Sequence, residues 1–415
     1  MKILFVSMGN SVHTVRWVKM LSGTGWDIRL FPVNFLTGTH PEFEAIKNLK
    51  IYSPKLLGRF IKKYKKTKKE RQSNLENLEK ILRAEDSSSM NWRDVVRKIL
   101  PDNRAKMLVS IIRNFKPDLV HSMHIQEGGY LAMQAKQILK DKFPKWLVTN
   151  WGSELNLFSK ISTQESKIKE VLENCDYFSG ECSNDIRIAR SLGFKGEFLR
   201  PIVPNSGGID FDYINKIKKP GLTSERKLIM LKGYQNWAGR SLVGLRALER
   251  CSDVLQDYRV AIYCIDSMEV AVAAELFTKK TGIPVVIIPM ETPHEEILDY
   301  HGRSRISIGL SITDAISTSL IEAMVMGSFP IQSNTSCGSE WLEDGKSGIF
   351  VNPEDPEDTE RAVRRAIADD EFVNRAALVN YNNLLERLNY QKIQDIVVKN
   401  YEKVIRGEPF SIGTD

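Results

Sequence analysis

The sequence predicts an α/β protein built from two doubly wound, Rossmann-like domains. Short apolar runs of strand type alternate with helical stretches, and the alternation restarts after a turn-rich segment at 201–220. The 415 residues also exceed what one hydrophobic core usually organises. Because ligands of such sheets bind beyond the carboxyl ends of the strands, we expect the two domains to face each other across a central cleft.

The first domain, assigned to residues 1–205, opens with a parallel βαβ unit. A buried-strand pattern at 3–6 leads into the turn Gly9-Asn10-Ser11, then a helix and a second strand at 28–31. Further strand-type runs follow at 119–120, 146–148 and 198–199. Helical stretches separate most of these runs, which indicates a parallel sheet.

A solvated connector, assigned to residues 206–222, follows the first domain. It contains Gly207-Gly208 and ends near Pro220, which is the chemistry of turns and loops. The second domain is assigned to residues 223–388. Its strand-type runs lie at 228–231, 260–263, 285–288, 306–310 and 329–331.

Residues 49–107 depart from the alternation and are assigned as a basic, helical insertion. Between 55 and 71 the chain is crowded with lysine, while its apolar side chains fall on one helical face. Such a helix could lie on an anionic membrane surface through residues 55–69. A solvated helix that packs on its own domain is an equally good interpretation. No nucleic-acid partner is expected, because no aromatic-interleaved binding motif accompanies the charge.

The amino-acid composition limits the cellular compartment in which the protein is expected and the kinds of binding site that it can contain. The sequence contains no run of eighteen apolar residues, so no membrane span is expected. The five cysteines show no Cys-x-x-Cys spacing. We therefore expect neither a disulfide nor a metal site. We expect a cytoplasmic protein, which could also lie at the inner face of the plasma membrane. The absence of Gly-x-Gly-x-x-Gly argues against an NAD-dependent dehydrogenase.

The candidate functional site centres on residues 310–331. A strand ends near Leu310, Asp314 can cap the following helix, and Gly327 ends that helix. A helix that starts at the carboxyl end of a strand aims free N–H groups and positive dipole at the ligand. Such a terminus suits a diphosphate.

Polar side chains surround this helix terminus. The hydroxyl donors are Ser317, Thr318 and Ser319. Asp314 and Glu322 could accept hydrogen bonds from sugar or ribose hydroxyls. Taken singly, each acid is as well explained as a helix cap or a surface residue.

The spacing of these acids resembles the hallmark of the retaining glycosyltransferases of family 4, which have the GT-B fold. Seven residues separate Asp314 from Glu322, which heads the run Glu322-Ala323-Met324-Val325-Met326-Gly327-Ser328-Phe329-Pro330. Asp314 stands where the family usually has Glu, and Ala315 and Ser317 stand where it commonly has Gly. The resemblance implies sugar transfer, with retention and without a metal, from a nucleotide diphosphate sugar such as a UDP-sugar.

The resemblance extends over most of the chain and implies further roles. His124 ends a strand of the acceptor domain and would line the active site, while Asn150 replaces the family's histidine in the next turn. The remaining acceptor-side candidates are Gly9, Asn10, Ser11, Trp151, Gly152 and Glu154. Residues 389–415 would form the terminal helix that crosses back onto the first domain. The acceptor would be a saccharide or a lipid-linked saccharide, as in polysaccharide biosynthesis.

The expected diphosphate clamp departs from the family pattern. The family has Gly-Arg after the first strand of the second domain, whereas this chain has Gly233-Tyr234. Arg240 is the best substitute, because its guanidinium can grip two phosphate oxygens, and Lys232 is the weaker candidate. The catalytic candidates are therefore His124, Asp314 and Arg240. The donor-binding candidates are Lys232, Gly233, Ser317, Thr318, Ser319, Leu320 and Glu322.

Two other functions remain open at this stage. A nucleotide-sugar epimerase of the same fold would need several acid/base residues near the sugar, and the 310–331 segment offers few. A non-catalytic carbohydrate- or membrane-binding scaffold is favoured by the departures at Asn150, Ala315 and Ser317.

Overall fold

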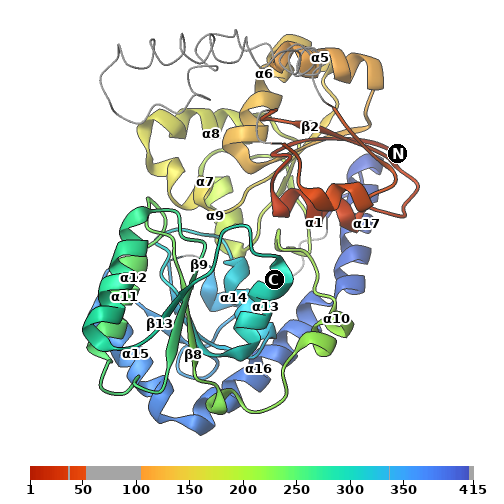
Figure 1. The fold of residues 1–415 in the computed structure, drawn as a ribbon. Coiled ribbons are helices and arrows are strands. Elements are labelled where there is room, and N and C mark those ends of the chain that lie inside the picture. Colours follow the sequence, from red (N-terminus) through yellow and green to blue (C-terminus); the bar gives the residue numbers. More distant parts are fainter. Residues whose placement is uncertain (36–37, 53–103, 336, 411–415) are drawn as a thin grey trace, which may run out of the picture. The chain divides into compact units, whose positions relative to one another are not determined.

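A computed structural model describes residues 1–35, 38–52, 104–335 and 337–410. The chain divides into two compact units. The first comprises Met1–Thr149 with Asn174–Asp176, and the second comprises Asn150–Glu173 with Tyr177–Asp415. Both contain a parallel sheet with interleaved helices, so the predicted two-domain α/β class is confirmed (Figure 1). The basic stretch at 55–69 and most of the proposed insertion lie outside the described residues.

The first unit has the strand order β3-β2-β1-β4-β5, all parallel. Its elements are β1 (Lys2–Ser7), α1 (Val12–Met20), β2 (Asp27–Pro32), η1 (Pro41–Ala45), β3 (Leu49–Ile51), α5 (Arg104–Phe115), β4 (Leu119–Met123), η2 (His124–Gly129), α6 (Tyr130–Leu139), η3 (Lys140–Lys142) and β5 (Lys145–Thr149).

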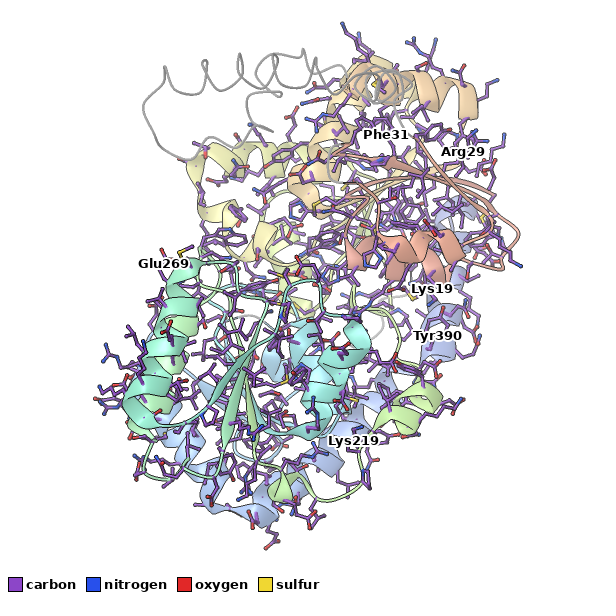
Figure 2. All side chains as sticks on the ribbon, viewed as in Figure 1. Lys19, Arg29, Phe31, Lys219, Glu269 and Tyr390 are labelled. Carbon is purple, nitrogen blue, oxygen red and sulfur yellow. A yellow bond between two sulfur atoms is a disulfide. The ribbon has the colours of Figure 1, made fainter. Side chains whose placement is uncertain are left out.

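The central strands of this sheet form where the sequence has continuous runs of apolar residues. Residues 3–6 of β1 are fully buried, as expected for a parallel strand covered on both faces. On β2, Phe31 is fully buried, whereas Arg29 pairs with Asp27 at 3.0 Å and stacks its guanidinium 3.8 Å from the Phe115 ring centre (Figure 2). The stacking covers the apolar part of the arginine side chain and leaves its charge paired.

The second unit has a six-stranded parallel sheet in the order β10-β9-β8-β11-β12-β13, and β6 and β7 form a parallel pair. Its elements begin with α7 (Ser153–Asn156), η4 (Phe158–Lys160), α8 (Ser162–Asn174), β6 (Tyr177–Ser179), α9 (Ser183–Ser191), β7 (Glu197–Phe198), α10 (Phe211–Ile217), η5 (Thr223–Glu225), β8 (Leu228–Lys232), α11 (Ser241–Arg250) and β9 (Arg259–Tyr263). They continue with α12 (Met268–Thr281), β10 (Val285–Ile287), α13 (His294–Arg303), β11 (Ser304–Gly309), α14 (Thr318–Val325), β12 (Phe329–Ser333), η6 (Gly338–Glu340), β13 (Ile349–Val351), α15 (Pro356–Ala368), α16 (Asp370–Leu388) and α17 (Tyr390–Arg406).

Alternation along β8 assigns its side chains to the two faces of the second sheet. Ile229 and Leu231 belong to the large core cluster that includes residues of α11, α12 and α15. Met230 belongs to the smaller cluster packed against α13. The face of each β8 side chain follows from this period of two.

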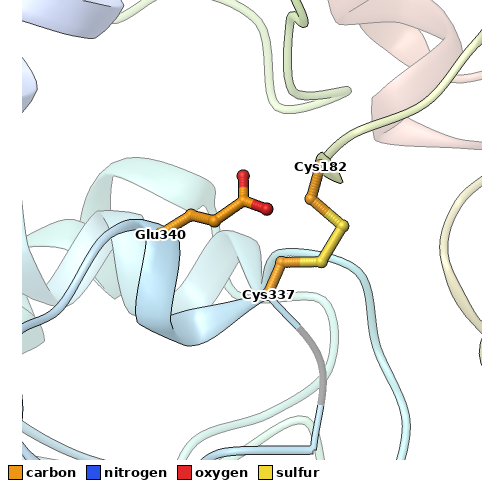
Figure 3. Close-up of side chains that lie close together, drawn as sticks. All are labelled: Cys182, Cys337 and Glu340. Carbon is orange, nitrogen blue, oxygen red and sulfur yellow. A yellow bond between two sulfur atoms is a disulfide. The ribbon is translucent and has the colours of Figure 1, made fainter. Parts of the chain in front are cut away.

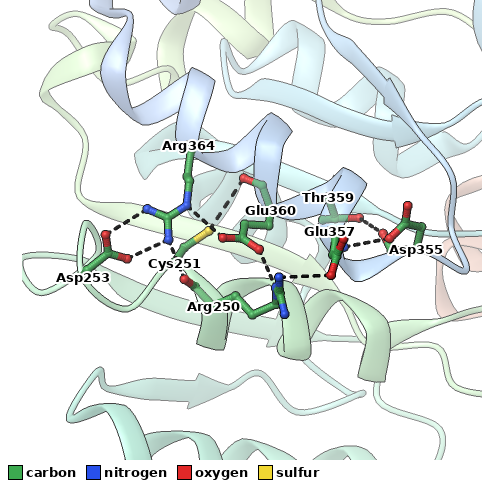
Figure 4. Close-up of polar contacts among 8 residues, drawn as sticks. All are labelled: Arg250, Cys251, Asp253, Asp355, Glu357, Thr359, Glu360 and Arg364. Atoms are coloured by element: carbon green, nitrogen blue, oxygen red, sulfur yellow. Dashed lines mark hydrogen bonds and ion pairs between the residues drawn. The ribbon is translucent and has the colours of Figure 1, made fainter.

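Two arginine arrangements fasten helices of the second unit. Arg305 is 2% exposed and donates to the carbonyls of Ala366 (2.8 and 3.0 Å) and Ile367 (3.0 Å) at the end of α15, as well as to Asp370 at 2.7 Å. A more exposed network joins α11 to α15, in which Arg364 donates both terminal nitrogens to Asp253 at 2.9 Å (Figure 4). Only the first arrangement satisfies buried backbone carbonyls.

Candidate functional site

The carboxyl end of β8 presents Lys232 and then turns at Gly233. The Gly233 nitrogen donates to the Tyr263 carbonyl at 2.7 Å, and a Cβ at this glycine would lie 2.8 Å from the same oxygen. A larger residue would therefore separate the ends of β8 and β9. Tyr234 follows, and burial, together with neighbouring negative groups, raises its pKa to about 12.

The N-terminus of α14 lies beside Lys232. Ser317 is the N-cap in extended conformation, and Thr318 begins the helix. The Lys232 ammonium donates to the Ser317 hydroxyl at 3.4 Å. Ser319 hydrogen-bonds the Tyr263 hydroxyl, whose pKa is raised by burial. Lys232 therefore contacts Ser317, and Ser319 contacts Tyr263 on the neighbouring strand β9, at the same end of the sheet.

Asp314 also interacts with Lys232. Burial raises the pKa of its carboxyl group, while the Lys232 charge and the Ala315 N–H, 3.0 Å from Oδ1, oppose that shift. The Lys232 ammonium also lies 4.9 Å from the centre of the Tyr234 ring. Lys232 thus supplies positive charge to both Asp314 and the helix terminus.

The turn at 150–154 braces the loop that carries Asp314. Gly152 has φ +96°, and a Cβ there would lie 2.1 Å from the Ala315 nitrogen, so only glycine permits this approach. The Asn156 amide donates to the Asp314 carbonyl at 3.1 Å. The buried Glu154 carboxylate accepts from the Trp151 nitrogen at 2.9 and 3.1 Å. Gly152 therefore has a structural role in placing Asp314, and Glu154 has one within the 150–154 turn.

A second pair of buried acids lies near this turn, and the sequence analysis did not identify it. Glu181 accepts from the Asn205 nitrogen at 2.6 Å, and Asp185 accepts from the Glu181 nitrogen at 2.9 Å. Burial raises the pKa of Glu181 well above its usual range and that of Asp185 to about 7. No spacing in the sequence marks these acids, because one follows β6 and the other lies on α9.

Glu322 of α14 has a partner from α13. Its Oε1 lies 2.6 Å from His294 Nε2, and its side chain is 13% exposed against 46% for His294. The carboxylate is therefore oriented by a neighbouring imidazole at the accessible edge of the site. Leu320, two residues earlier, is buried, at 3% exposure. The sequence analysis missed His294 because it stands on a different helix, 28 residues away.

Arg240 is engaged elsewhere. It is the N-cap of α11; its Nε donates to Glu354 at 2.7 Å, and one terminal nitrogen donates to the Asn236 and Gly239 carbonyls at 2.9 Å. The carboxylate that precedes α15 thus neutralises the arginine we had favoured for a diphosphate. The two candidate cations of the clamp therefore differ sharply in their surroundings.

The first unit carries the remaining candidates. His124 has φ +69°, which is strained for a residue with a side chain, and begins the π-helix η2 at the end of β4. Its Nδ1 accepts from the Glu127 nitrogen at 3.3 Å. Ser11 caps α1 through the His13 nitrogen at 3.2 Å, after the exposed Asn10 and the buried Gly9. Ser11 therefore has a structural role independent of any ligand.

The cysteines contradict one expectation. Cys182 and Cys337 form a disulfide with a Cα–Cα distance of 6.1 Å, beside Glu340 (Figure 3). Their 155-residue separation gives no local spacing that a sequence pattern could reveal. Within the described ranges, these three residues are the group whose ligand atoms lie close enough together, within 4.8 Å, to hold a metal ion.

None of the helices in the described part of the chain is long and apolar enough to cross a bilayer.

Family models match consecutive parts of the sequence. The model for glycosyl transferases group 1 matches residues 225–383, and the model for glycosyl transferase 4-like proteins matches residues 72–177. No curated protein matches the sequence of the chain. The first model includes the segment with Asp314 and Glu322, and the second includes the turn at 150–154.

Solved structures share the whole architecture at low sequence identity. Sucrose-phosphate synthase from Thermosynechococcus elongatus is 13% identical with a TM-score of 0.69, over 98% of this chain and 100% of that one. Anabaena HepE in complex with UDP-glucose is 9% identical with a TM-score of 0.67, over 97% and 100%. A glycosyltransferase from Rickettsia africae ESF-5 is 14% identical with a TM-score of 0.64, over 98% of each chain. At such identities the likeness establishes the fold.

Proposed function

Since this chain is a family-4-like glycosyltransferase of the GT-B fold, we propose that it uses a nucleotide diphosphate sugar and that its second unit binds a UDP-sugar through Lys232 and the N-terminus of α14. The observation that carries this assignment is the 3.4 Å contact between the Lys232 ammonium and Ser317 at that terminus. The HepE structure with UDP-glucose supports the choice of nucleotide.

The diphosphate would replace intramolecular partners at this helix terminus. Free N–H groups at the start of α14, the hydroxyls of Ser317 and Thr318, and the Lys232 ammonium all present hydrogen-bond donors to an anion. In a partly buried site these donors act with little screening. Arg240 would contribute only after leaving Glu354, so we place it second.

The two acids would hold hydroxyl groups of the donor. Glu322, with its carboxylate oriented by His294, would accept from the ribose. Asp314 would contact the hydroxyls of the sugar; burial raises the pKa of its carboxyl group, and the Lys232 charge partly opposes that rise. Ser319 and Leu320 would complete the wall of the site from the first turn of α14.

Catalysis would depend on stabilising the charge that grows on the leaving diphosphate. Lys232 and the α14 terminus are fixed before the reaction, so they need no reorganisation in the transition state. We propose that they serve in place of a metal ion and that the anomeric configuration is retained, as the family resemblance implies.

The first unit would supply the acceptor side. His124 occupies a strained backbone position at the end of β4, which is typical of a functional residue. Gly9 and Asn10 of the first unit, and Trp151 of the second, would add contacts to a saccharide or a lipid-linked saccharide. A role in polysaccharide biosynthesis at the inner face of the plasma membrane, through residues 55–69, completes the proposal.

A panel of nucleotide sugars tests the function. The protein is incubated with UDP- and GDP-sugars, with and without EDTA, and released nucleotide and product anomers are followed by NMR. Slow hydrolysis of a UDP-sugar with retention, insensitive to EDTA and at least tenfold slower in Glu322→Gln, is expected. Conversion to an epimeric sugar would favour the epimerase, and absence of any nucleotide binding would leave a scaffold.

A further inference from the structure

The disulfide lies next to the loop that carries Asp314. Cys182 is the N-cap of α9 and Cys337 precedes η6, and both are buried, at 0% and 2% exposure. Glu340 accepts from the Ser183 nitrogen at 2.9 Å, so its carboxylate is fixed beside the sulfurs (Figure 3). The bond thus ties α9 to the segment after β12.

The backbone connects this bond to the candidate donor site. The Cys337 nitrogen donates to the Ala315 carbonyl at 3.1 Å. On the other side, Gly152 approaches the Ala315 nitrogen too closely to admit even a methyl group. Ala315 is therefore held between Cys337 and Gly152, and its neighbour Asp314 shares that placement.

We propose that the Cys182–Cys337 disulfide is a redox-sensitive link that positions Asp314, so that its reduction weakens binding of the donor sugar. The inference rests on the proposed role of Asp314 in holding that sugar. Cys182 and Cys337 are positioning residues here, since their effect passes through the Ala315 carbonyl.

The size of the movement follows from covalent radii. A dithiol reductant donates two electrons and two protons, so the S–S bond becomes two thiols and the reductant becomes a disulfide. Bonded sulfurs lie about 2.05 Å apart, whereas non-bonded heavy atoms need about 3.5–4 Å. Reduction thus separates the sulfur atoms of Cys182 and Cys337 by roughly 1.5–2 Å. Part of that shift would be transmitted to the 3.1 Å hydrogen bond from the Cys337 nitrogen to the Ala315 carbonyl.

The remaining supports limit the effect. The Asn156 amide still holds the Asp314 carbonyl, at 3.1 Å. Lys232 lies on β8, outside the 311–317 segment, and the first turn of α14 starts at Thr318. Reduction should therefore loosen the sugar contact while the diphosphate contacts persist.

Hydrogen exchange gives a readout that needs no ligand. Intact protein is compared with protein reduced by dithiothreitol under native conditions, with reduction verified by alkylation and mass spectrometry. We expect peptides covering 311–317 to exchange about tenfold faster after reduction. Cys251→Ser, at the buried free cysteine that caps the C-terminus of α11, should keep the response, and Cys337→Ser should exchange fast in both states. A bond that resists reduction, or unchanged exchange in 311–317, would overturn the proposal.

Calorimetry connects the link to the donor. Reduction should weaken UDP-glucose binding about fivefold to tenfold and UDP binding less than twofold, and reoxidation should restore both. Equal losses for the two ligands would contradict positioning through Asp314. If exchange responds but neither ligand binds, the link stands and the proposed function fails. A stoichiometric metal ion held by the reduced protein and lost in Glu340→Gln would show that the cysteines are ligands, and would overturn the redox role.

Discussion

Lys232→Met tests the cation of the donor site most directly. The substitution keeps an unbranched side chain of similar length and removes the ammonium that contacts Ser317 at 3.4 Å. A hydrogen bond to a charged group contributes about 1.5–3 kcal/mol, and each 1.4 kcal/mol is tenfold in affinity. We therefore expect the Kd for UDP to rise roughly 10- to 150-fold.

Calorimetry with UDP and with uridine measures this change. Uridine lacks the diphosphate, so its affinity should be the same in Lys232→Met and in the parent protein. Arg240→Gln is the matched control, because the arginine it replaces already pairs with Glu354 at 2.7 Å. Its effect on UDP should stay below about threefold, in line with an exposed ion pair.

Two results would refute this reasoning. Unchanged UDP affinity in Lys232→Met would mean that the diphosphate lies away from the α14 terminus. A larger loss in Arg240→Gln than in Lys232→Met would mean that Arg240 leaves Glu354 when the ligand binds. Either result would move the clamp to the other face of the second sheet.

Three further predictions concern packing and charge in the second unit. Arg305→Ala should lower the free energy of unfolding by about 3–5 kcal/mol, because buried carbonyls lose their donor. Arg364→Ala, in the exposed network, should lower it far less. Urea unfolding followed by circular dichroism compares the two variants, and equal losses would contradict the burial argument. Asp185→Asn should stabilise the protein at pH 8 and leave it unchanged at pH 4. Burial raises the pKa of Asp185 to about 7, so the folded state binds a proton more tightly than the unfolded state. The contribution of this proton to the free energy of unfolding is complete below about pH 4 and is lost as the pH rises through 7. An identical pH dependence of stability in both proteins would exclude this cause. Gly152→Ala should reduce donor hydrolysis about tenfold or more while UDP affinity is kept, because the added methyl group displaces Ala315. Full activity in this variant would show that the contact between residues 152 and 315 is dispensable.

The sequence predicted those parts of the fold whose signal is local. The βαβ unit at the N-terminus and the strands of the second sheet have continuous apolar runs, and all of them are present. The strands it missed, β3, β6 and β13, have three residues each and lie away from the sheet centres, so their apolar signal is short. Asp314 and Ser317 were expected at the same helix terminus because a strand end and a helix start lie close together in sequence, but the N-cap of α14 is Ser317 and not Asp314.

Long-range contacts of the site were beyond the sequence. His294 reaches Glu322 from another helix, and the Cys182–Cys337 pair spans 155 residues. Residue type alone also does not reveal the surroundings of each candidate cation. A guanidinium is the better phosphate ligand in general, but that preference says nothing about which carboxylate already occupies it.

The face of the sheet explains why Lys232 rather than Arg240 meets the α14 terminus. Along β8, Ile229 and Leu231 pack toward α11 and α15, and Met230 packs toward α13. The period of two places Lys232 on the same face as Met230, which is the face where α14 begins after β11. Arg240, as the N-cap of α11, is on the opposite face and meets Glu354 ahead of α15. On the Lys232 side, the ammonium and the positive end of α14 repel each other unless an anion lies between them, and a diphosphate would supply that charge. Burial raises the pKa of the neighbouring Asp314 carboxyl group, which weakens this acid as a substitute for the charge of the ligand.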